Sequence, residues 1–138
     1  MVNFQKEHYS YEDMLEIMRL LRAPGGCPWD AEQTHESIRR NFLEETCEAV
    51  EAIDNHDMPA LREELGDVLM QVIFHAQMEA EVGGFTMRDV IDGLCRKLVY
   101  RHPHVFSDVK VANSDEVLTN WEALKRQEKA QRSTADAI

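Results

Sequence analysis

Apolar residues along this chain recur three and four positions apart, rather than at every second position. That spacing is typical of helices with one buried face, and not of half-buried strands. Glycine and proline are scarce and clustered, and they separate the stretches that carry the helical pattern. We therefore predict an all-α fold, a bundle of about four to five helices over residues 10–22, 34–54, 57–82, 86–101 and 114–127.

Turn and capping residues support these boundaries. Ser10 is followed three residues later by Asp13, which is the spacing of a capping box. Asp57 can cap the third predicted helix. The proline two positions later does not oppose this start, since proline is tolerated in a first helical turn. The segments 23–28 and 101–106 are rich in residues that break helices and are predicted to be non-helical.

The apolar stripe of each predicted helix is expected to face the core. On the second and third helices the residues expected to be buried are Ile38, Phe42, Ala49, Ile53, Leu61, Leu65, Val68, Val72 and Ile73. A short turn between these helices predicts a central antiparallel hairpin. Residues 1–127 are predicted to form one domain, and residues 128–138 are predicted to be a polar C-terminal tail that frays.

The charge balance excludes one class of partner. The chain has 138 residues, of which 26 are acidic and 15 basic, so its net charge is −11. A strongly acidic domain binds nucleic acid and anionic membranes poorly, because its charge repels the phosphate groups of both. We therefore expect neither nucleic acid nor a membrane as a partner.

The cysteines are Cys27, Cys47 and Cys95, an odd number without a C-x-x-C pair. This count argues against a disulfide framework and against a zinc ribbon. No apolar stretch reaches membrane-spanning length, and the first residues contain no apolar signal core. A reducing, cytoplasmic location is therefore expected.

Acidic residues of the second and third predicted helices fall into matching register. Counted from His56 in the turn, Glu48 should lie level with Glu64, and Glu45 level with Asp67. Three residues of helix advance about 4.5 Å, so the four carboxylates would form a compact square beside the apolar stripes. A solvated acidic face is the alternative interpretation of the same pattern.

Four half-buried carboxylates would repel one another at neutral pH unless they keep protons or hold cations. A ligand set made only of carboxylate oxygens favours a hard ion, Mg²⁺ or alternatively Mn²⁺. Mg²⁺ held in this way commonly leaves positions open for phosphate oxygens, so a nucleotide or another polyphosphate is the expected partner.

Basic and aromatic residues are candidates for the rest of a nucleotide site. Lys97 and Arg101 lie four residues apart on one helix face, where they would bind phosphate or form an ordinary exposed basic pair. Trp29, in a loop bracketed by proline and glycine, is expected either to stack on a base or to anchor the loop. The helical spacing of Trp121 is more typical of a core residue than of a ligand contact.

Taken together, these residues resemble the MazG family of nucleoside triphosphate pyrophosphohydrolases. The carrying motif is E-E-x-x-E followed by E-x-x-D, here at residues 44–48 and 64–67. The flanking segments Gly-Cys-Pro-Trp-Asp at 26–30, Gln-Thr-His-Glu-Ser at 33–37 and Arg-His-Pro-His-Val-Phe at 101–106 are similar too. The resemblance covers roughly residues 10 to 127.

The resemblance implies a helical, Mg²⁺-dependent enzyme that cleaves a nucleoside triphosphate between the α and β phosphates, giving the monophosphate and pyrophosphate. It maps Glu45, Glu48, Glu64 and Asp67 to metal ligands with a catalytic role. Glu44 matches the leading glutamate of the motif, but its helical position makes it the weaker ligand candidate.

The resemblance also implies positions that contact the substrate. Lys97 and Arg101 map to the phosphate-binding region, and Trp121 with Lys125 to a C-terminal segment near the nucleotide; Trp29 joins them as a candidate. Family members assemble as homodimers or larger oligomers, with sites near the subunit interfaces.

Two other function classes remain open at this point. A carboxylate-bridged di-iron bundle needs two Glu-x-x-His motifs on different helices, and only Glu32 with His35 offers one. A noncatalytic helical interaction module would use its acidic face to engage a basic partner. Metal content distinguishes the di-iron bundle from the magnesium enzyme. Turnover of nucleoside triphosphates distinguishes the noncatalytic module from that enzyme.

Overall fold

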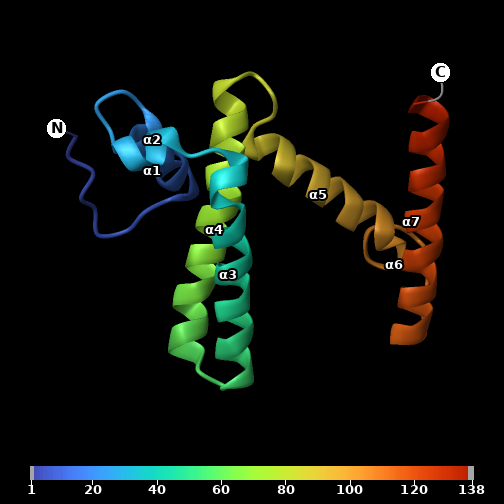
Figure 1. Cartoon of the computed structure of the whole chain (residues 1–138). Coiled ribbons are helices and arrows are strands. Elements are labelled where there is room, and N and C mark those ends of the chain that lie inside the picture. The colour runs from blue at the N-terminus through green and yellow to red at the C-terminus, as the bar shows by residue number, and fades with distance from the viewer. Residues whose placement is uncertain (1, 137–138) are drawn as a thin grey trace. The chain divides into compact units, whose positions relative to one another are not determined.

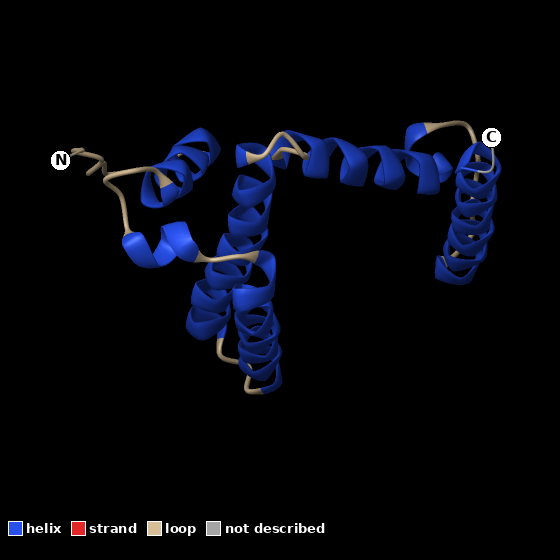
Figure 2. Ribbon diagram, turned by 45° about the horizontal axis from the view of Figure 1, so that its top comes forward, coloured by secondary structure: helices blue, strands red, loops and turns tan. Residues whose placement is uncertain are grey.

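A computed structural model describes residues 2–136, with side chains described as far as residue 131. These residues form helices and loops, and no strand occurs among them (Figure 2). The prediction of an all-α fold is therefore confirmed for the described chain. The helices are α1 (Tyr11–Arg22), α2 (Pro28–Glu32), α3 (His35–Asp54), α4 (Met58–Glu81), α5 (Met87–Arg101), α6 (Pro103–Phe106) and α7 (Ser114–Asp136) (Figure 1).

The described residues contain seven helices, so the prediction of four to five is wrong. The two additional helices are the short α2 and α6, and each begins with the proline that was expected to mark a break. Proline suits the first helical position, because the amide hydrogen that it lacks would have no partner there. Pro28 and Pro103 therefore each start a short helix, in addition to ending the helical stretch before them.

The capping predictions are confirmed at two helix starts. The hydroxyl of Ser10 accepts a hydrogen bond from the Asp13 backbone N–H, and the Asp13 carboxylate accepts one from the Ser10 N–H, at 3.1 and 3.0 Å. Asp57 Oδ1 accepts a hydrogen bond from the backbone N–H of Ala60 at 3.1 Å. The caps pair amide groups that a helix start otherwise leaves without partners.

The last helix, α7, is longer than the polar composition of its final residues indicates. A polar tail from residue 128 was expected to fray, whereas α7 continues through this stretch to Asp136. Residues 137–138 of the expected tail lie outside the described residues. The division of the chain into one domain over 1–127 and a tail stays a prediction.

The chain divides into two compact units, Met1–Met87 and Arg88–Ile138. In the first unit, α3 and α4 lie side by side in opposite directions, joined by a short turn (Figure 1). His56 adopts a φ of 53° in this turn, where the chain reverses. Met18 of α1 packs with Ile38 of α3 and with Ile73 of α4 in the buried core.

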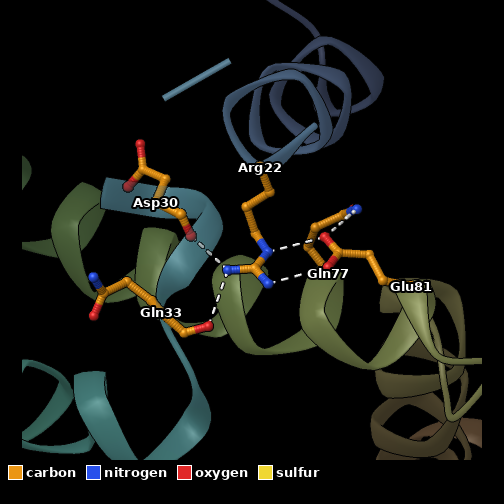
Figure 3. A network of polar contacts seen from close by, with 5 residues as sticks. All are labelled: Arg22, Asp30, Gln33, Gln77 and Glu81. Atoms are coloured by element: carbon orange, nitrogen blue, oxygen red, sulfur yellow. Dashed lines mark hydrogen bonds and ion pairs between the residues drawn. The ribbon is translucent and has the colours of Figure 1, made fainter. Parts of the chain in front are cut away.

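Arg22 ties the N-terminal helices to α4 (Figure 3). Its Nε and Nη2 donate to the two carboxylate oxygens of Glu81 at 2.9 and 3.1 Å, and its Nη1 donates to the carbonyl oxygens of Asp30 and Gln33. Its guanidinium carbon also lies 5.5 Å from the centre of the Phe74 ring. One buried side chain therefore fixes α1, α2 and the segment that precedes α3 against α4.

Part of the predicted core is exposed. Ile38, Ala49 and Ile73 are buried, but Ile53 and Leu65 remain 52% and 54% exposed. The helical pattern identifies the apolar face correctly, but it does not show whether this chain or another surface covers that face. None of the described helices is both long and apolar enough to cross a membrane.

Candidate metal centre

Three glutamates from two helices come together on the α3–α4 hairpin. Glu45 and Glu48 on α3 and Glu64 on α4 each offer one carboxylate oxygen, and these three oxygens lie within 4.8 Å of one another. The spacing follows from helix geometry, because residues three apart on one helix share a face and the antiparallel turn places Glu48 beside Glu64. Atoms this close can share one metal ion.

The other acidic candidates lie around this group. Asp67 is half-buried and is not a member of the group of three, but its negative charge acts on both Glu45 and Glu64. Glu44 is exposed, and its Oε1 lies 3.2 Å from Nε of Arg40. The structure therefore brings three of the four expected carboxylates within common reach, and it turns Glu44 toward solvent.

The crowding of carboxylates changes their protonation. Burial raises the pKa of Glu64 to about 7, and its contact with Glu48 and the charges of Asp67 and Glu45 add to the effect. Burial also raises the pKa of Glu45, with further contributions from the charges of Glu48 and Asp67. Each additional negative charge makes it harder for the next carboxyl group to ionise.

Two oxygens of this group, Glu45 Oε2 and Glu64 Oε2, are buried without a hydrogen-bond partner among the described residues. Unpaired buried carboxylate oxygens are costly, and a cation between them would remove that cost. The donor set consists of carboxylate oxygens alone, which suits Mg²⁺ or Mn²⁺ and not zinc or copper. The residues present therefore fit a hard divalent ion.

The expected phosphate-binding residues belong to the second unit. Lys97 on α5 is exposed, and Lys125 on α7 is half-buried. Arg101, at the end of α5, is buried: its Nε donates to Glu128 Oε1 at 2.9 Å, and its guanidinium lies 5.3 Å from the Trp121 ring centre. Arg101 is thus engaged by a carboxylate and an indole of α7, in place of the exposed pair with Lys97 that the sequence left open.

Trp121 contacts two neighbours in the second unit. Besides Arg101, the ring of His102 meets it edge-on with centroids 4.9 Å apart. His102 Nδ1 lies 2.7 Å from the carbonyl oxygen of Leu98, one turn earlier. These contacts agree with the interpretation of Trp121 as a packed residue of this unit.

Trp29 lies on α2 in the first unit, with 54% of its surface exposed. Its backbone carbonyl accepts a hydrogen bond from Gln33 Nε2 at 2.8 Å, so the backbone anchors the segment while the indole stays accessible. The accessible ring leaves Trp29 available to stack on a flat ligand.

Sequence reasoning missed a second cluster, on α3 and α4. The imidazoles of His35 and His75 stack with centroids 4.9 Å apart, and their Nδ1 atoms lie 2.7 Å apart. His35 Nε2 lies 2.7 Å from Glu79 Oε2. The two histidines and Phe42 line a groove of about 520 Å³. The register of the hairpin could have indicated this pair, because His35 lies 21 residues before His56 and His75 lies 19 residues after it.

Comparison with known proteins adds an independent line of evidence. A family model described as the MazG nucleotide pyrophosphohydrolase domain matches residues 33–106. The chain is also similar to a solved structure, a mazG-related protein from Thermotoga maritima, with a TM-score of 0.66 and 28% identity over 83% of this chain and 98% of that one.

Curated relatives agree with the family match. The chain is 48% identical over 126 residues to the nucleoside triphosphate pyrophosphohydrolase of Escherichia coli (strain K12), covering 91% of this chain and 48% of the relative. It is 46% identical over 125 residues to the nucleoside triphosphate pyrophosphohydrolase/pyrophosphatase MazG of Thermotoga maritima, covering 91% and 48%. It is 47% identical over 133 residues to the uncharacterized protein YabN of Bacillus subtilis, covering 95% and 27%. The chain thus spans half or less of the length of these relatives.

Proposed function

The chain belongs to the MazG nucleotide pyrophosphohydrolase family, and we propose that it is a Mg²⁺-dependent enzyme that hydrolyses nucleoside triphosphates between the α and β phosphates. The products would be a nucleoside monophosphate and pyrophosphate. The observation that carries the proposal is the meeting of Glu45, Glu48 and Glu64, whose carboxylate oxygens lie within 4.8 Å of one another. The relatives from Escherichia coli and Thermotoga maritima are named nucleoside triphosphate pyrophosphohydrolases, which supports hydrolysis of nucleoside triphosphates.

Four acidic residues are assigned to the divalent ion in this proposal. Glu45, Glu48 and Glu64 would hold it directly, and Asp67 would add the fourth carboxylate from α4. Mn²⁺ is the alternative ion, because it prefers the same oxygen ligands. When bound, such an ion neutralises phosphate charge and makes a coordinated water more acidic.

The chain's own groups would then manage charge and protons. A carboxylate at the centre accepts the proton of the attacking water, as general bases in hydrolases do. Glu44, paired with Arg40 on the exposed face of α3, is assigned to orient water or that basic neighbour rather than to bind the ion. Two helices hold the carboxylates in place, so little reorganisation is needed when substrate arrives.

Residues of the second unit are proposed to contact the substrate. Lys97 and Arg101 would bind phosphate, with Lys125 and Trp121 near the nucleotide, and Trp29 of the first unit would stack on the base. Arg101 already binds an anion, the carboxylate of Glu128, at 2.9 Å. A phosphate oxygen would take over this contact, because guanidinium groups bind carboxylate and phosphate in the same way.

We further propose that the protein acts as a homodimer or a larger homo-oligomer. Several large apolar side chains of the hairpin are about half exposed: Leu43, Val50, Ile53, Leu65 and Leu69. At 100° per residue they fall on one flank of α3 and α4, opposite to Glu48 and Asp67. A contiguous apolar flank of this kind is typical of an interface, and a second copy of the chain would bury it.

A cytoplasmic location completes the proposal. It is supported by the three cysteines, each of which is free in the structure. Free thiols persist where the surroundings are reducing, and nucleoside triphosphates are made and used in that compartment.

The test is to identify the products. The purified chain is incubated with a panel of ribo- and deoxyribonucleoside triphosphates, with Mg²⁺ or with EDTA, and pyrophosphate and orthophosphate are measured separately. The proposal expects pyrophosphate and monophosphate in equal amounts with Mg²⁺, and neither with EDTA. Orthophosphate release would contradict the cleavage position, and absence of turnover with every substrate would favour a noncatalytic acidic module.

A further inference from the structure

Gln71 on α4 is one of two polar or charged residues that are buried in the described chain. It is 4% exposed, and its Oε1 has no hydrogen-bond partner within the described part of the chain. Arg101, the other buried residue of this kind within the described chain, is by contrast paired with Glu128. An apolar side chain of similar size at position 71 would avoid burying an unpaired amide oxygen. The amide therefore points to a polar partner.

The position of Gln71 indicates which partner that is. It lies one helical turn beyond Asp67 and two turns beyond Glu64 on the same stripe of α4. Counted from His56 in the turn, it lies level with Asn41 on α3, which is one turn from Glu45. Gln71 thus borders the carboxylate group from the side away from the turn.

The Gln71 amide and the Glu45 carboxylate have complementary hydrogen-bonding groups. Glu45 Oε2 is a buried acceptor without a partner, and the Gln71 amide contains two N–H donors beside its unpaired oxygen. Rotation of the amide by 180° about its last side-chain bond exchanges the oxygen and the nitrogen at almost no change in shape. This rotation would direct an N–H donor to the place where Oε1 now has no partner.

We propose that Gln71 is a positioning residue of the carboxylate centre, whose amide donates a hydrogen bond to Glu45 and fixes the orientation of that carboxylate for the divalent ion. The inference rests on the proposed function, because it assigns Glu45 as a ligand. Ligating carboxylates are usually held by such outer hydrogen bonds, and removing one weakens metal affinity roughly 10- to 100-fold.

The first experiment measures Mg²⁺ binding by titration calorimetry, without substrate, for the wild type and for Gln71→Met. The variant should keep its circular dichroism and melt in EDTA at the same temperature as the wild type or higher, yet bind Mg²⁺ roughly 10- to 100-fold more weakly. Gln77→Met is the matched control, because Gln77 is on the same helix and donates to Glu81 at 3.1 Å instead. Equal Mg²⁺ affinity in Gln71→Met and the wild type would overturn the inference.

A second measurement needs no variant and covers the case in which Gln71→Met does not fold. The side-chain amide protons of Gln71 are followed by nitrogen–proton NMR during a Mg²⁺ titration of the wild type. They should shift as the ion binds while those of Gln77 stay in place, and unchanged Gln71 signals would overturn the inference. Mg²⁺ binding without turnover of any nucleoside triphosphate would instead count against the proposed function alone.

Discussion

A carboxylate oxygen of Glu48 on α3 and one of Glu64 on α4 lie within 4.8 Å of each other, although both groups are acids. Burial, together with this proximity, raises the pKa of Glu64 to about 7. Two like charges this close together repel, so ionisation of one carboxyl group opposes ionisation of the other. Between about pH 4.5 and 7, the folded chain without metal therefore retains a proton on Glu64 that the unfolded chain would release.

The first prediction concerns pH and stability in EDTA. The pKa of Glu64 is higher in the folded state, at about 7, than the ordinary glutamate value of 4.5. Between these values the folded state binds more protons, so its stability falls as pH rises and then levels off above about 7. Melting curves from pH 4.5 to 8 should show this loss, and Glu64→Gln should remove much of it.

Mg²⁺ should reverse that loss, because it replaces the protons at high pH. Melting temperatures measured at pH 8 with millimolar Mg²⁺ should exceed those in EDTA, and the difference should shrink at pH 5. An identical melting temperature with and without Mg²⁺ at pH 8 would count against a preformed site.

The second prediction separates chemistry from folding. Glu48→Gln or Asp67→Asn should lower Mg²⁺-dependent hydrolysis roughly 100-fold or more, since loss of an outer-shell partner alone already costs 10- to 100-fold. Helix content by circular dichroism should be unchanged, because Glu48 is exposed and Asp67 is only half-buried. Glu51→Gln, an exposed residue one turn from Glu48, is the control and should retain wild-type activity. Full activity in either of the two test variants would refute its assignment as a ligand.

The third prediction tests the Arg22 anchor. Arg22 is bound by Glu81 and by the carbonyls of Asp30 and Gln33, so Arg22→Ala removes four hydrogen bonds and takes away the donor of Glu81 Oε1 and of the Gln33 carbonyl. We expect a loss of about 3 kcal/mol in the free energy of unfolding, measured by urea denaturation. Arg40→Ala, which removes only an exposed pair with Glu44, should change it by less than about 1 kcal/mol. A loss no larger than that of the control would mean that the anchor contributes little.

The fourth prediction concerns self-association. Leu65 and Leu69 are 54% and 49% exposed on the apolar flank of α4. A charge at Leu65 would have to be desolvated in an interface, so Leu65→Glu should shift the chain toward a monomer in sedimentation velocity experiments. Val82→Glu changes another exposed apolar residue, just past the end of α4, and should leave the assembly unchanged. A wild type that is monomeric at micromolar concentration would contradict the proposal directly.

Much of the first unit could be predicted from local pattern. The caps at Ser10 and Asp57 depend on residues within three positions of the helix start, so the sequence alone reveals them. The approach of Glu48 to Glu64 follows from the length of one turn and from the helix rise. Such features are predictable because neighbours in the sequence determine them.

Other features depend on contacts that local pattern does not contain. The short helices at Pro28 and Pro103 were predicted as breaks, because proline ends one helix and starts another with the same local sequence. The hairpin register brings His35 and His75 nearly level, but it does not indicate that their rings stack with centroids 4.9 Å apart. The engagement of Arg101 by Glu128 joins α5 to α7, and spacing along α5 alone indicates only that Arg101 shares a face with Lys97.

The most direct test of the central claim is to locate the ion. Crystals grown with Mn²⁺ and a nonhydrolysable nucleoside triphosphate analogue would be measured at the manganese absorption edge. We expect an anomalous peak bound by oxygens of Glu45, Glu48 and Glu64 at coordination distance, with phosphate oxygens on its open side. Manganese bound elsewhere, with these three carboxylates free of metal, would contradict the account.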